Sequence, residues 1–365
     1  MRLRDRDAII TAEGIIFRVY GYTHPESGYI CDVEYAPSSI FKSQIPKAFR
    51  QRVNTETYYK FFEDEGLRFV RKNYPRYQLF HEPLQEKIVG VRKKDIKKTR
   101  KPDQGVKQLL DKLPSDQLHK ATLNLLKLVI ETTGLKHENF GVFGSLLHGF
   151  YHPKFSDIDL IIYGKCSLKR LLKFLKDAYQ SSSTPLQNEF KTIKTIEGKN
   201  WRFRNYSPKE FLWHQRRKLI YGLFKDIKIN RIIKTEFEPV KEWHEIRNEY
   251  TNMVRITKLG WAKALVRVTD DSEAAFMPAK YRVETLQLST SIKEKVESID
   301  QIISYVEEFR MQAFKDEVVY VEGNLEQLTT SKKVLHQITL TRCPRYYEQV
   351  MKLNDLRCNS LKKFQ

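Results

Sequence analysis

The 365-residue sequence has few cysteines and no long apolar run. The cysteines are far apart and include no C-x-x-C pair, which argues against a zinc site or a disulfide framework. They are Cys31, Cys166, Cys343 and Cys358. No window reaches the roughly eighteen consecutive apolar residues that a membrane-spanning helix needs. Residues 1–7 lack the apolar core of a signal peptide. These absences predict a protein with reduced thiols in the cytoplasm.

Acidic residues are in the minority, because 65 Lys and Arg stand against 45 Asp and Glu, for a formal charge of +20. Residues 66–101 hold 12 basic and 3 acidic residues, and residues 165–234 hold 18 basic and 5 acidic ones. Two basic blocks favour a polyanionic partner, above all nucleic acid. The alternative is that both blocks are solvated lysine-rich faces, with residues 92–101 as a solvated linker.

Composition and periodicity predict a mixed α+β protein rather than a disordered chain, since 41% of the residues are apolar. Helical periods and capping residues predict helices over residues 56–73, 115–133, 167–179 and 208–221, and over 292–308. Ser115 and Ser207 are the predicted N-caps of the helices over 115–133 and 208–221, and Gly134 is the predicted end of the first of these two. Alternating or buried-type runs predict strands over residues 8–35, 78–91, 140–143, 158–163, 224–233 and 260–288, and a hairpin over 316–341.

Breaks in the pattern predict three segments. Lys101-Pro102-Asp103 follows the densest basic run, and the chain changes character after Glu238-Pro239. The predicted division is an N-terminal α+β segment over 1–101, a core domain over 102–240, and a β-rich accessory domain over 241–365.

The most informative motif combines a small-residue bend with two acids. Val142-Phe143-Gly144-Ser145 is followed, after eleven residues, by Asp157-Ile158-Asp159-Leu160. A strand that ends in glycine allows backbone amides to approach a phosphate closely. Ser145 then opens a predicted helix, whose hydroxyl and N-terminal amides suit phosphate oxygens.

The two aspartates are predicted to act together. On a strand, residues i and i+2 project to the same face, so Asp157 and Asp159 lie side by side while Ile158 and Leu160 enter the core. Two adjacent carboxylates repel each other, and a divalent cation removes that penalty. Oxygen-only ligands favour Mg²⁺ over Zn²⁺.

This pattern resembles the DNA polymerase β-type nucleotidyltransferase superfamily. The stretch GSLLHGFYHPKFSDIDLIIYG is most similar to a group of uncharacterised archaeal predicted nucleotidyltransferases, as are RVYGYTHPESGYICDVEYAP and FMPAKYRVE. The resemblance implies a nucleotidyltransferase core with a mixed sheet and flanking helices, between β-rich N- and C-terminal segments. It also implies that Asp157 and Asp159 hold one or two Mg²⁺ ions, while Gly144 and Ser145 hold the phosphates of an NTP.

The resemblance further implies a third carboxylate from a later strand. Asp226 is the candidate catalytic and metal-binding residue, since it lies on the alternating run 224–229. It is otherwise an ordinary exposed aspartate paired with a nearby cation. Asp270, Asp271 and Glu273 are the alternatives. His148, His152 and Lys154, in the spacer, either neutralise the triphosphate or donate a proton, or they are solvated or hydrogen-bonded loop side chains.

Aromatic and basic side chains interleave from Trp201 to Tyr206, a mixture that suits single-stranded nucleic acid. The alternative is that the aromatic rings belong to a core. The predicted nucleic-acid-binding residues are Arg202, Arg204, Arg216, Arg217 and Lys218.

Together these features predict a Mg²⁺-dependent nucleotidyltransferase that transfers NMP from an NTP to a hydroxyl acceptor, an RNA or DNA end, with RNA favoured. Two alternatives stay open. One is NMP transfer to a protein or a small molecule, and the other is a non-catalytic nucleic-acid-binding protein that retains a nucleotide pocket.

Overall fold

The computed structural model describes residues 2–51, 56–196, 201–290, 296–342 and 345–354. The chain forms two compact units. The first comprises residues 1–80, 87–188 and 219–248, and the second comprises residues 81–86, 189–218 and 249–365. Within the described residues, no helix is both long and apolar enough to cross a membrane.

The units do not coincide with the three predicted segments. β8 (Lys98–Arg100) lies inside the basic run that suggested a boundary, yet it pairs with β1 (Ala8–Ile10). The run is therefore part of a sheet rather than a linker. α-Helices and β-sheets both occur in the described residues, which is consistent with the predicted α+β class.

The N-terminal sheet has the strand order β4-β5-β3-β2-β1-β8, and β7 joins it by pairing with β3 and β6. Its other strands and its helix are β2 (Ile16–Val19), β3 (Gly28–Pro37), β4 (Phe49–Gln51), β5 (Thr57–Lys60), β6 (Gln78–His81), β7 (Glu86–Arg92) and α1 (Glu65–Asn73). The strands predicted over 8–35 and 78–91 are confirmed. The helix predicted over 56–73 begins only at Glu65, because Thr57-Tyr58-Tyr59 has strand-forming side chains and pairs with β3.

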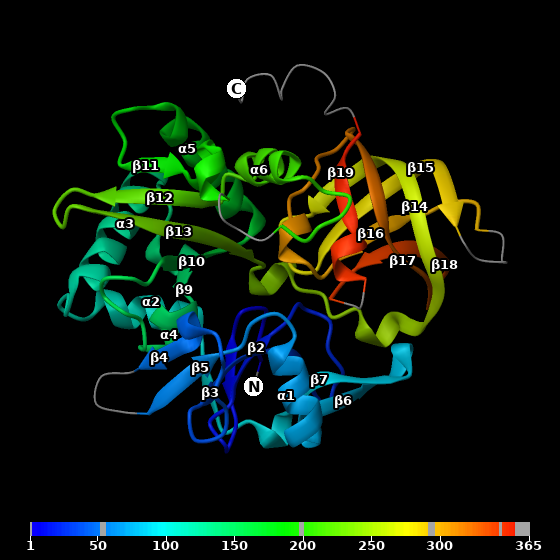
Figure 1. The fold of residues 1–365 in the computed structure, drawn as a ribbon, viewed down its shortest axis with the longest axis horizontal. Helices are drawn as coiled ribbons and strands as arrows, with labels where there is room; N and C mark the ends of the chain where they lie inside the picture. The colour runs from blue at the N-terminus through cyan, green and yellow to red at the C-terminus, as the bar shows by residue number, and fades with distance from the viewer. Residues whose placement is uncertain (1, 52–55, 197–200, 291–295, 343–344, 355–365) are drawn as a thin grey trace. The chain divides into compact units, whose positions relative to one another are not determined.

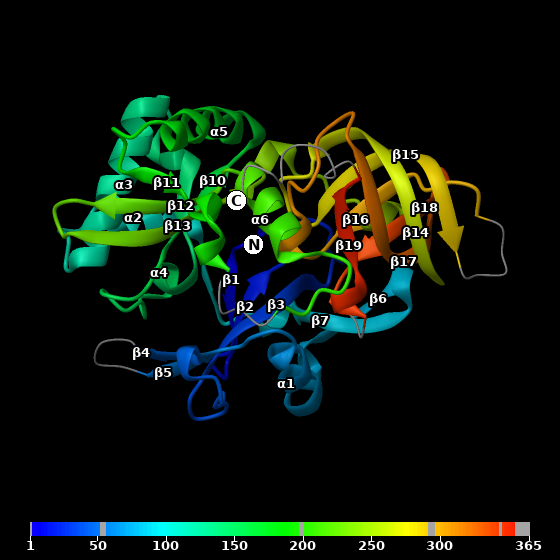
Figure 2. The same cartoon turned by 45° about the horizontal axis from the view of Figure 1, so that its top comes forward.

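A second sheet of the first unit carries the motif. Its order is β11-β12-β13-β10-β9. The strands are β9 (Phe140–Val142), β10 (Ile158–Tyr163), β11 (Leu186–Asn188), β12 (Tyr221–Asp226) and β13 (Arg231–Val240). β10 and β13 are parallel and the other pairs are antiparallel, so the sheet is mixed. The strand predicted over 224–233 is instead a hairpin of β12 and β13 with its turn at residues 227–230, and it projects beyond the other strands (Figure 1, Figure 2).

Two helices cover one face of this sheet, α3 (Gln117–Thr133) and α5 (Lys165–Gln180). The side chains beneath them are fully buried and include Ile158, Leu160, Ile162 and Phe237. Asp116, rather than the predicted Ser115, caps α3 by accepting a hydrogen bond from the His119 amide at 3.0 Å. Gly134 ends α3 with a positive φ of 66°, as predicted. Two shorter helices, α2 (Pro102–Leu110) and α4 (Gly144–His148), flank β9.

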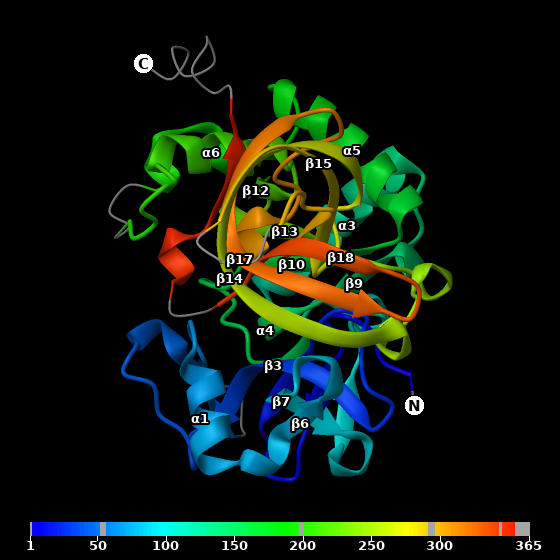
Figure 3. The same cartoon turned by 90° about the vertical axis from the view of Figure 1, so that its right-hand side faces the viewer.

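The second unit is built around a closed barrel, seen from one end in Figure 3. The barrel order is β14-β15-β16-β18-β17, and β17 pairs back with β14. The strands are β14 (Met253–Glu273), β15 (Ala279–Thr290), β16 (Gln301–Ser304), β17 (Val318–Thr330) and β18 (Val334–Leu340), and β19 (Val350–Leu353) adds to β17. Apolar side chains such as Ala264, Val321 and Ile338 fill its interior.

The predictions for this region are partly confirmed. The strands over 260–288 and the hairpin over 316–341 are present as predicted. The helix predicted over 292–308 is wrong where the structure describes it, from residue 296 on, because β16 pairs there with β15 and β18. Residues 292–295 lie outside the described residues. α6 (Pro208–Arg217) begins with the predicted Ser207 cap, and Ser207 Oγ accepts from the Glu210 amide. It stops before residue 221, where β12 begins.

The packing of β10 leads to a test of the core. Replacing Leu160, which is completely buried, by alanine removes apolar contacts under α3 and α5 and leaves a cavity. We expect a loss of ~2–5 kcal/mol in the free energy of unfolding, measured by denaturant titration. The matched control is Leu113→Ala, at a leucine that is 92% exposed, which should leave stability nearly unchanged. Equal losses in the two variants would contradict the placement of Leu160.

Candidate active site

Asp157 and Asp159 lie on the face of the sheet opposite α3 and α5. Ile158 and Leu160 are buried under those helices, so the alternating aspartates project the other way. Asp157 is exposed and Asp159 is partly buried. The two carboxylates therefore share one face, as the spacing predicts.

Gly144 lies directly against Asp159. A Cβ atom built on Gly144 would be 2.8 Å from Asp159 Oδ2, and the φ of Gly144 is +60°. The Phe143 amide donates a hydrogen bond to the Asp159 carbonyl oxygen at 3.1 Å, which fixes the bend beside β10. Ser145 follows as the second residue of α4. Only glycine combines this backbone conformation with the close approach of a carboxylate.

The surroundings of Asp159 hold an excess of acidic groups. Burial raises the pKa of Asp159 to about 7. The Lys60 ammonium opposes that rise, while Asp157, Glu238 and Glu34 add to it. A further cation near Asp159 would stabilise the ionised form of this carboxylate.

Asp226 does not lie on this face. It is opposite Arg231 in the β12–β13 register, and one position further along Lys225 is opposite Ile232. The register continues to place Tyr221 opposite Glu236, which is itself paired with Asp159. Asp226 alternates with that set and therefore projects to the helix-covered face.

The contacts of Asp226 agree with that position. The carboxylate is buried, with Oδ2 accepting from Asn124 Nδ2 of α3 at 2.8 Å and Oδ1 accepting from the Lys228 amide at 2.9 Å. The position of Asp226 does not fit the predicted role of third carboxylate. The hairpin turn at 227–230 places Asp226 on the helix-covered face, where its side chain ties the turn to α3.

Glu236 is the acid that sequence reasoning missed. It is directly opposite Asp159 on the parallel strand β13, is partly buried, and shares the face of both aspartates. The alternation Thr235-Glu236-Phe237 carries a strand signal, but the predicted strand stopped at residue 233. Asp270, Asp271 and Glu273 belong instead to β14 of the second unit, where Asp270 forms an ion pair with Arg282.

His148 is a structural residue of the spacer. It is buried, and Arg100 Nη1 lies 3.1 Å from its Nδ1 and donates to its carbonyl oxygen. Its Nε2 lies 3.8 Å from Glu34. Burial lowers the pKa of His148, although Glu34 opposes the shift.

His152 and Lys154 belong to the exposed loop before Asp157. The His152 amide donates to Ser156 Oγ at 2.8 Å, and the Lys154 amide donates to His152 Nδ1 at 3.1 Å. The His152 ring is therefore hydrogen-bonded within the loop, whereas the Lys154 side chain is exposed, which agrees with the second interpretation of these residues.

The predicted nucleic-acid-binding residues lie in the second unit, and two of them are used internally. Lys218 is completely buried, and its Nζ donates to the Glu308 carbonyl oxygen at 2.7 Å. Arg217 forms an ion pair with Glu317, and its guanidinium carbon lies 4.4 Å from the centroid of the Trp213 ring. Lys218 is thus a structural cation, and its predicted role in binding phosphates does not fit its burial.

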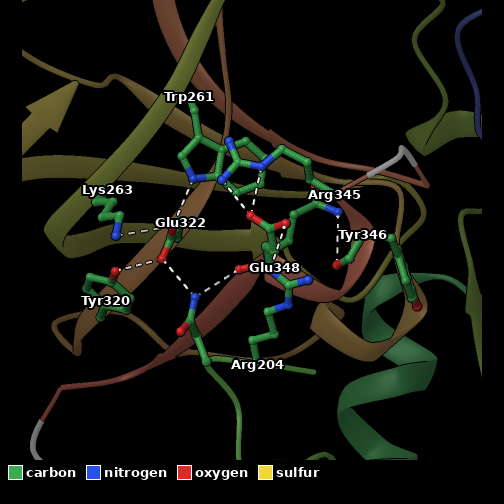
Figure 4. Close-up of polar contacts among 10 residues, drawn as sticks. Arg204, Trp261, Lys263, Tyr320, Glu322, Arg345, Tyr346 and Glu348 are labelled. Atoms are coloured by element: carbon green, nitrogen blue, oxygen red, sulfur yellow. Dashed lines mark hydrogen bonds and ion pairs between the residues drawn. The ribbon is translucent and has the colours of Figure 1, made fainter. Parts of the chain in front are cut away.

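Arg202, Arg204 and Arg216 are exposed. Arg204 lies 3.3 Å from Glu348, which also pairs with Arg345 (Figure 4). Arg202 donates to the Tyr347 hydroxyl at 2.9 Å. The neighbouring rings of Trp201 and Phe203 pack against the barrel core, so the core interpretation of these aromatic residues holds.

The same close-up shows a buried acid on the outside of the barrel. Glu322 accepts hydrogen bonds from Trp261 at 2.9 Å, Asn205 at 3.0 Å and Tyr320 at 2.9 Å, and Lys263 is 3.5 Å away (Figure 4). These donors satisfy the carboxylate, which links strands β14 and β17 rather than forming an open site.

Residues on the motif-bearing face suit a hard divalent cation by chemistry. Asp157, Asp159 and Glu236 offer only oxygen ligands, and the pKa of Asp159 is raised by burial and, to a smaller extent, by the neighbouring acids. In the part of the chain that the structure describes, no three His, Cys, Asp or Glu side chains are already gathered as a metal site. Holding an ion would therefore require these side chains to turn toward it.

Comparison with known proteins agrees with the motif. Residues 125–238 match the family model described as a nucleotidyltransferase domain. The resemblance to nucleotidyltransferases is confirmed. The matched residues include Gly144, both aspartates and Glu236, and the match supports a transferase that acts on an NTP.

The chain also resembles an uncharacterised protein of the archaeon Methanocaldococcus jannaschii. The two are 27% identical over 330 residues, which cover 90% of this chain and 92% of the relative. No solved structure shows a significant match to the chain. The similarity to this relative thus extends well beyond the nucleotidyltransferase domain.

The raised pKa of Asp159 predicts a pH-dependent stability. Because the pKa rises from 3.8 to about 7 on folding, folding favours the protonated carboxyl, and the protein loses stability as the pH rises through about 7. In EDTA, Asp159→Asn should therefore raise the melting temperature at about pH 8.5 and change it little at about pH 4. A variant less stable than the wild type at the higher pH would contradict this account of Asp159.

Proposed function

We propose that this protein is a metal-dependent nucleotidyltransferase that transfers NMP from an NTP to a hydroxyl at the end of an RNA or DNA strand. The observation that carries the proposal is the contact between the bend and the acid, with the Cβ position of Gly144 2.8 Å from Asp159 Oδ2. A phosphate held by the bend would lie beside the carboxylates of Asp157 and Asp159. The nucleotidyltransferase domain match over residues 125–238 supports the same chemistry.

Asp157, Asp159 and Glu236 would hold Mg²⁺. Glu236 would be the third metal-binding carboxylate, the role that the sequence analysis assigned to Asp226. When bound, the metal would neutralise the triphosphate and make the acceptor hydroxyl more acidic. Gly144 lets the bend lie directly against Asp159, and the hydroxyl and amide of Ser145 would donate to a phosphate oxygen.

The transfer makes one bond and breaks one. The acceptor oxygen bonds to the α-phosphorus of the NTP, the bond from that phosphorus to the bridging oxygen breaks, and pyrophosphate leaves. The hydroxyl proton passes to a carboxylate of the same face. Asp159 and its neighbours orient the reacting groups, and the chain itself forms no covalent intermediate.

A polynucleotide acceptor is favoured by the charge of the exposed face. Lys225 and Lys234 of the β12–β13 hairpin share the face of Glu236 and are exposed, whereas the opposite face is apolar and covered. A strand of phosphates would be attracted to that side of the sheet. A small uncharged acceptor would have no use for these cations.

The direct test supplies labelled NTPs and Mg²⁺ with RNA, with DNA, or with cell extract treated with nuclease. Label on an RNA or DNA strand supports the proposal. Label only on protein or on small molecules refutes the proposed acceptor, and no transfer from any of the four NTPs to any acceptor refutes the enzymatic proposal.

Single substitutions of the acids test whether Glu236 or Asp226 is the third metal-binding carboxylate. We expect Asp157→Asn, Asp159→Asn and Glu236→Gln each to lower the transfer rate ~100-fold or more, because each removes a charge that faces the triphosphate. Asp226→Asn should keep most of the activity, since that side chain faces α3. The transfer rates are measured by single-turnover assay, and the folding of each variant is checked by circular dichroism. Loss of activity in Asp226→Asn alone among these variants would reverse the assignment.

A further inference from the structure

Exposed apolar side chains lie in the loop before Asp157 and on the β12–β13 hairpin. Phe155, two residues before it, is 78% exposed, and Ile232 and Ile227 of the β12–β13 hairpin are 62% and 78% exposed. The hydration of such exposed apolar side chains is unfavourable, and burial of several of them against a partner would remove this free-energy cost. These side chains are therefore candidates for a binding surface.

The loop and the hairpin are tied together by one arginine. Arg231 Nη1 donates to the Pro153 carbonyl oxygen at 2.7 Å, and its Nη2 donates to the Ser156 carbonyl oxygen at 2.9 Å. The Phe155 amide donates to the His152 carbonyl oxygen at 3.1 Å, and the two rings lie 4.5 Å apart. Phe155 is thus held in a fixed loop beside the hairpin.

The hairpin strand leads from this group to the carboxylates. Ile232, Lys234 and Glu236 alternate along β13 on one face, and Lys225 is opposite Ile232. Glu236 is in turn opposite Asp159. The projecting end of the hairpin in Figure 1 and Figure 2 therefore continues into the face that carries the acids.

The same end of the sheet carries uncompensated positive charge. Lys154, Lys225 and Lys228 are exposed, and within the described ranges their ammonium groups make no hydrogen bond or ion pair. We define the acceptor surface as these three lysines with Phe155, Ile227 and Ile232, all of them exposed at this end of the sheet. Cations beside an exposed ring are the combination that binds single-stranded nucleic acid, with phosphates meeting the lysines and a base stacking on the ring.

We propose that the acceptor surface binds the end of a single-stranded nucleic acid, with a base on Phe155 and the backbone along Lys225 and Lys228. This inference rests on the proposed function and assigns its acceptor. The terminal hydroxyl of a strand bound there lies next to Asp157, two residues beyond Phe155. A base paired in a duplex offers no free face to the ring, so single strands bind more tightly than duplexes.

Binding without turnover tests the surface separately from catalysis. The fluorescence anisotropy of labelled 12-nucleotide RNA and DNA single strands, and of the matching duplexes, is measured with the full-length protein in EDTA and without NTP. Phe155→Ala should weaken single-strand binding ~5- to 150-fold, which corresponds to the loss of ~1–3 kcal/mol of stacking. The paired arms with RNA and DNA identify which strand is preferred.

The lysines are tested through salt dependence. The double variant Lys225→Ala with Lys228→Ala should reduce the slope of log Kd against log salt by about 1.4, or about 0.7 per lost phosphate contact on a single strand. The matched control is Lys169→Ala with Lys173→Ala, at exposed lysines of α5 on the opposite side of the sheet. That control should leave the slope nearly unchanged.

The ring has its own control in Phe80→Ala, since Phe80 is 51% exposed on β6. Wild-type affinity in Phe155→Ala, or an equal loss in Phe80→Ala, would overturn the inference. Tighter binding of duplexes than of single strands would also overturn it. A protein that binds strands through Phe155 but transfers no NMP would leave the surface standing and refute only the proposed function.

Discussion

The site depends on the contact between Gly144 and the carboxylate of Asp159. The missing Cβ allows the end of β9 to lie against β10, since any other side chain would place a carbon 2.8 Å from Asp159 Oδ2. The positive φ of Gly144 turns the chain from the end of β9 into α4, which also keeps the bend close to β10. One residue therefore places the bend and the pair of acids side by side.

This arrangement has an electrostatic cost that the N-terminal part of the chain offsets. Glu238, on the same strand as Glu236, is buried and accepts a hydrogen bond from the equally buried Arg6 at 2.9 Å. Lys60 of β5 lowers the pKa of Asp159 against the effect of burial. A buried acid is tolerated only with such partners. The N-terminal segment thus belongs to the electrostatic environment of the domain, which explains why residues 1–80 share its compact unit.

What could be predicted from the sequence was local. The shared face of Asp157 and Asp159, the bend at Gly144 and the caps at Ser207 and Gly134 follow from spacing and backbone preference alone. The exchange of Asp226 for Glu236 depends on a hairpin turn and on the β10–β13 register, which join residues distant in sequence. The burial of Lys218 under Glu308 and the pairing of β16 are likewise tertiary effects that override local pattern. Hence the bend and the two aspartates were readable from the sequence, whereas the position of Glu236 opposite Asp159 was not.

The most direct test of the account locates the cation. Crystals grown with Mn²⁺ and an unreactive NTP analogue would reveal the ion by its anomalous scattering. The account predicts a peak held by Asp157, Asp159 and Glu236, with the triphosphate beside Gly144 and Ser145. A nucleotide bound elsewhere, or an ion on the face of Asp226, would contradict it.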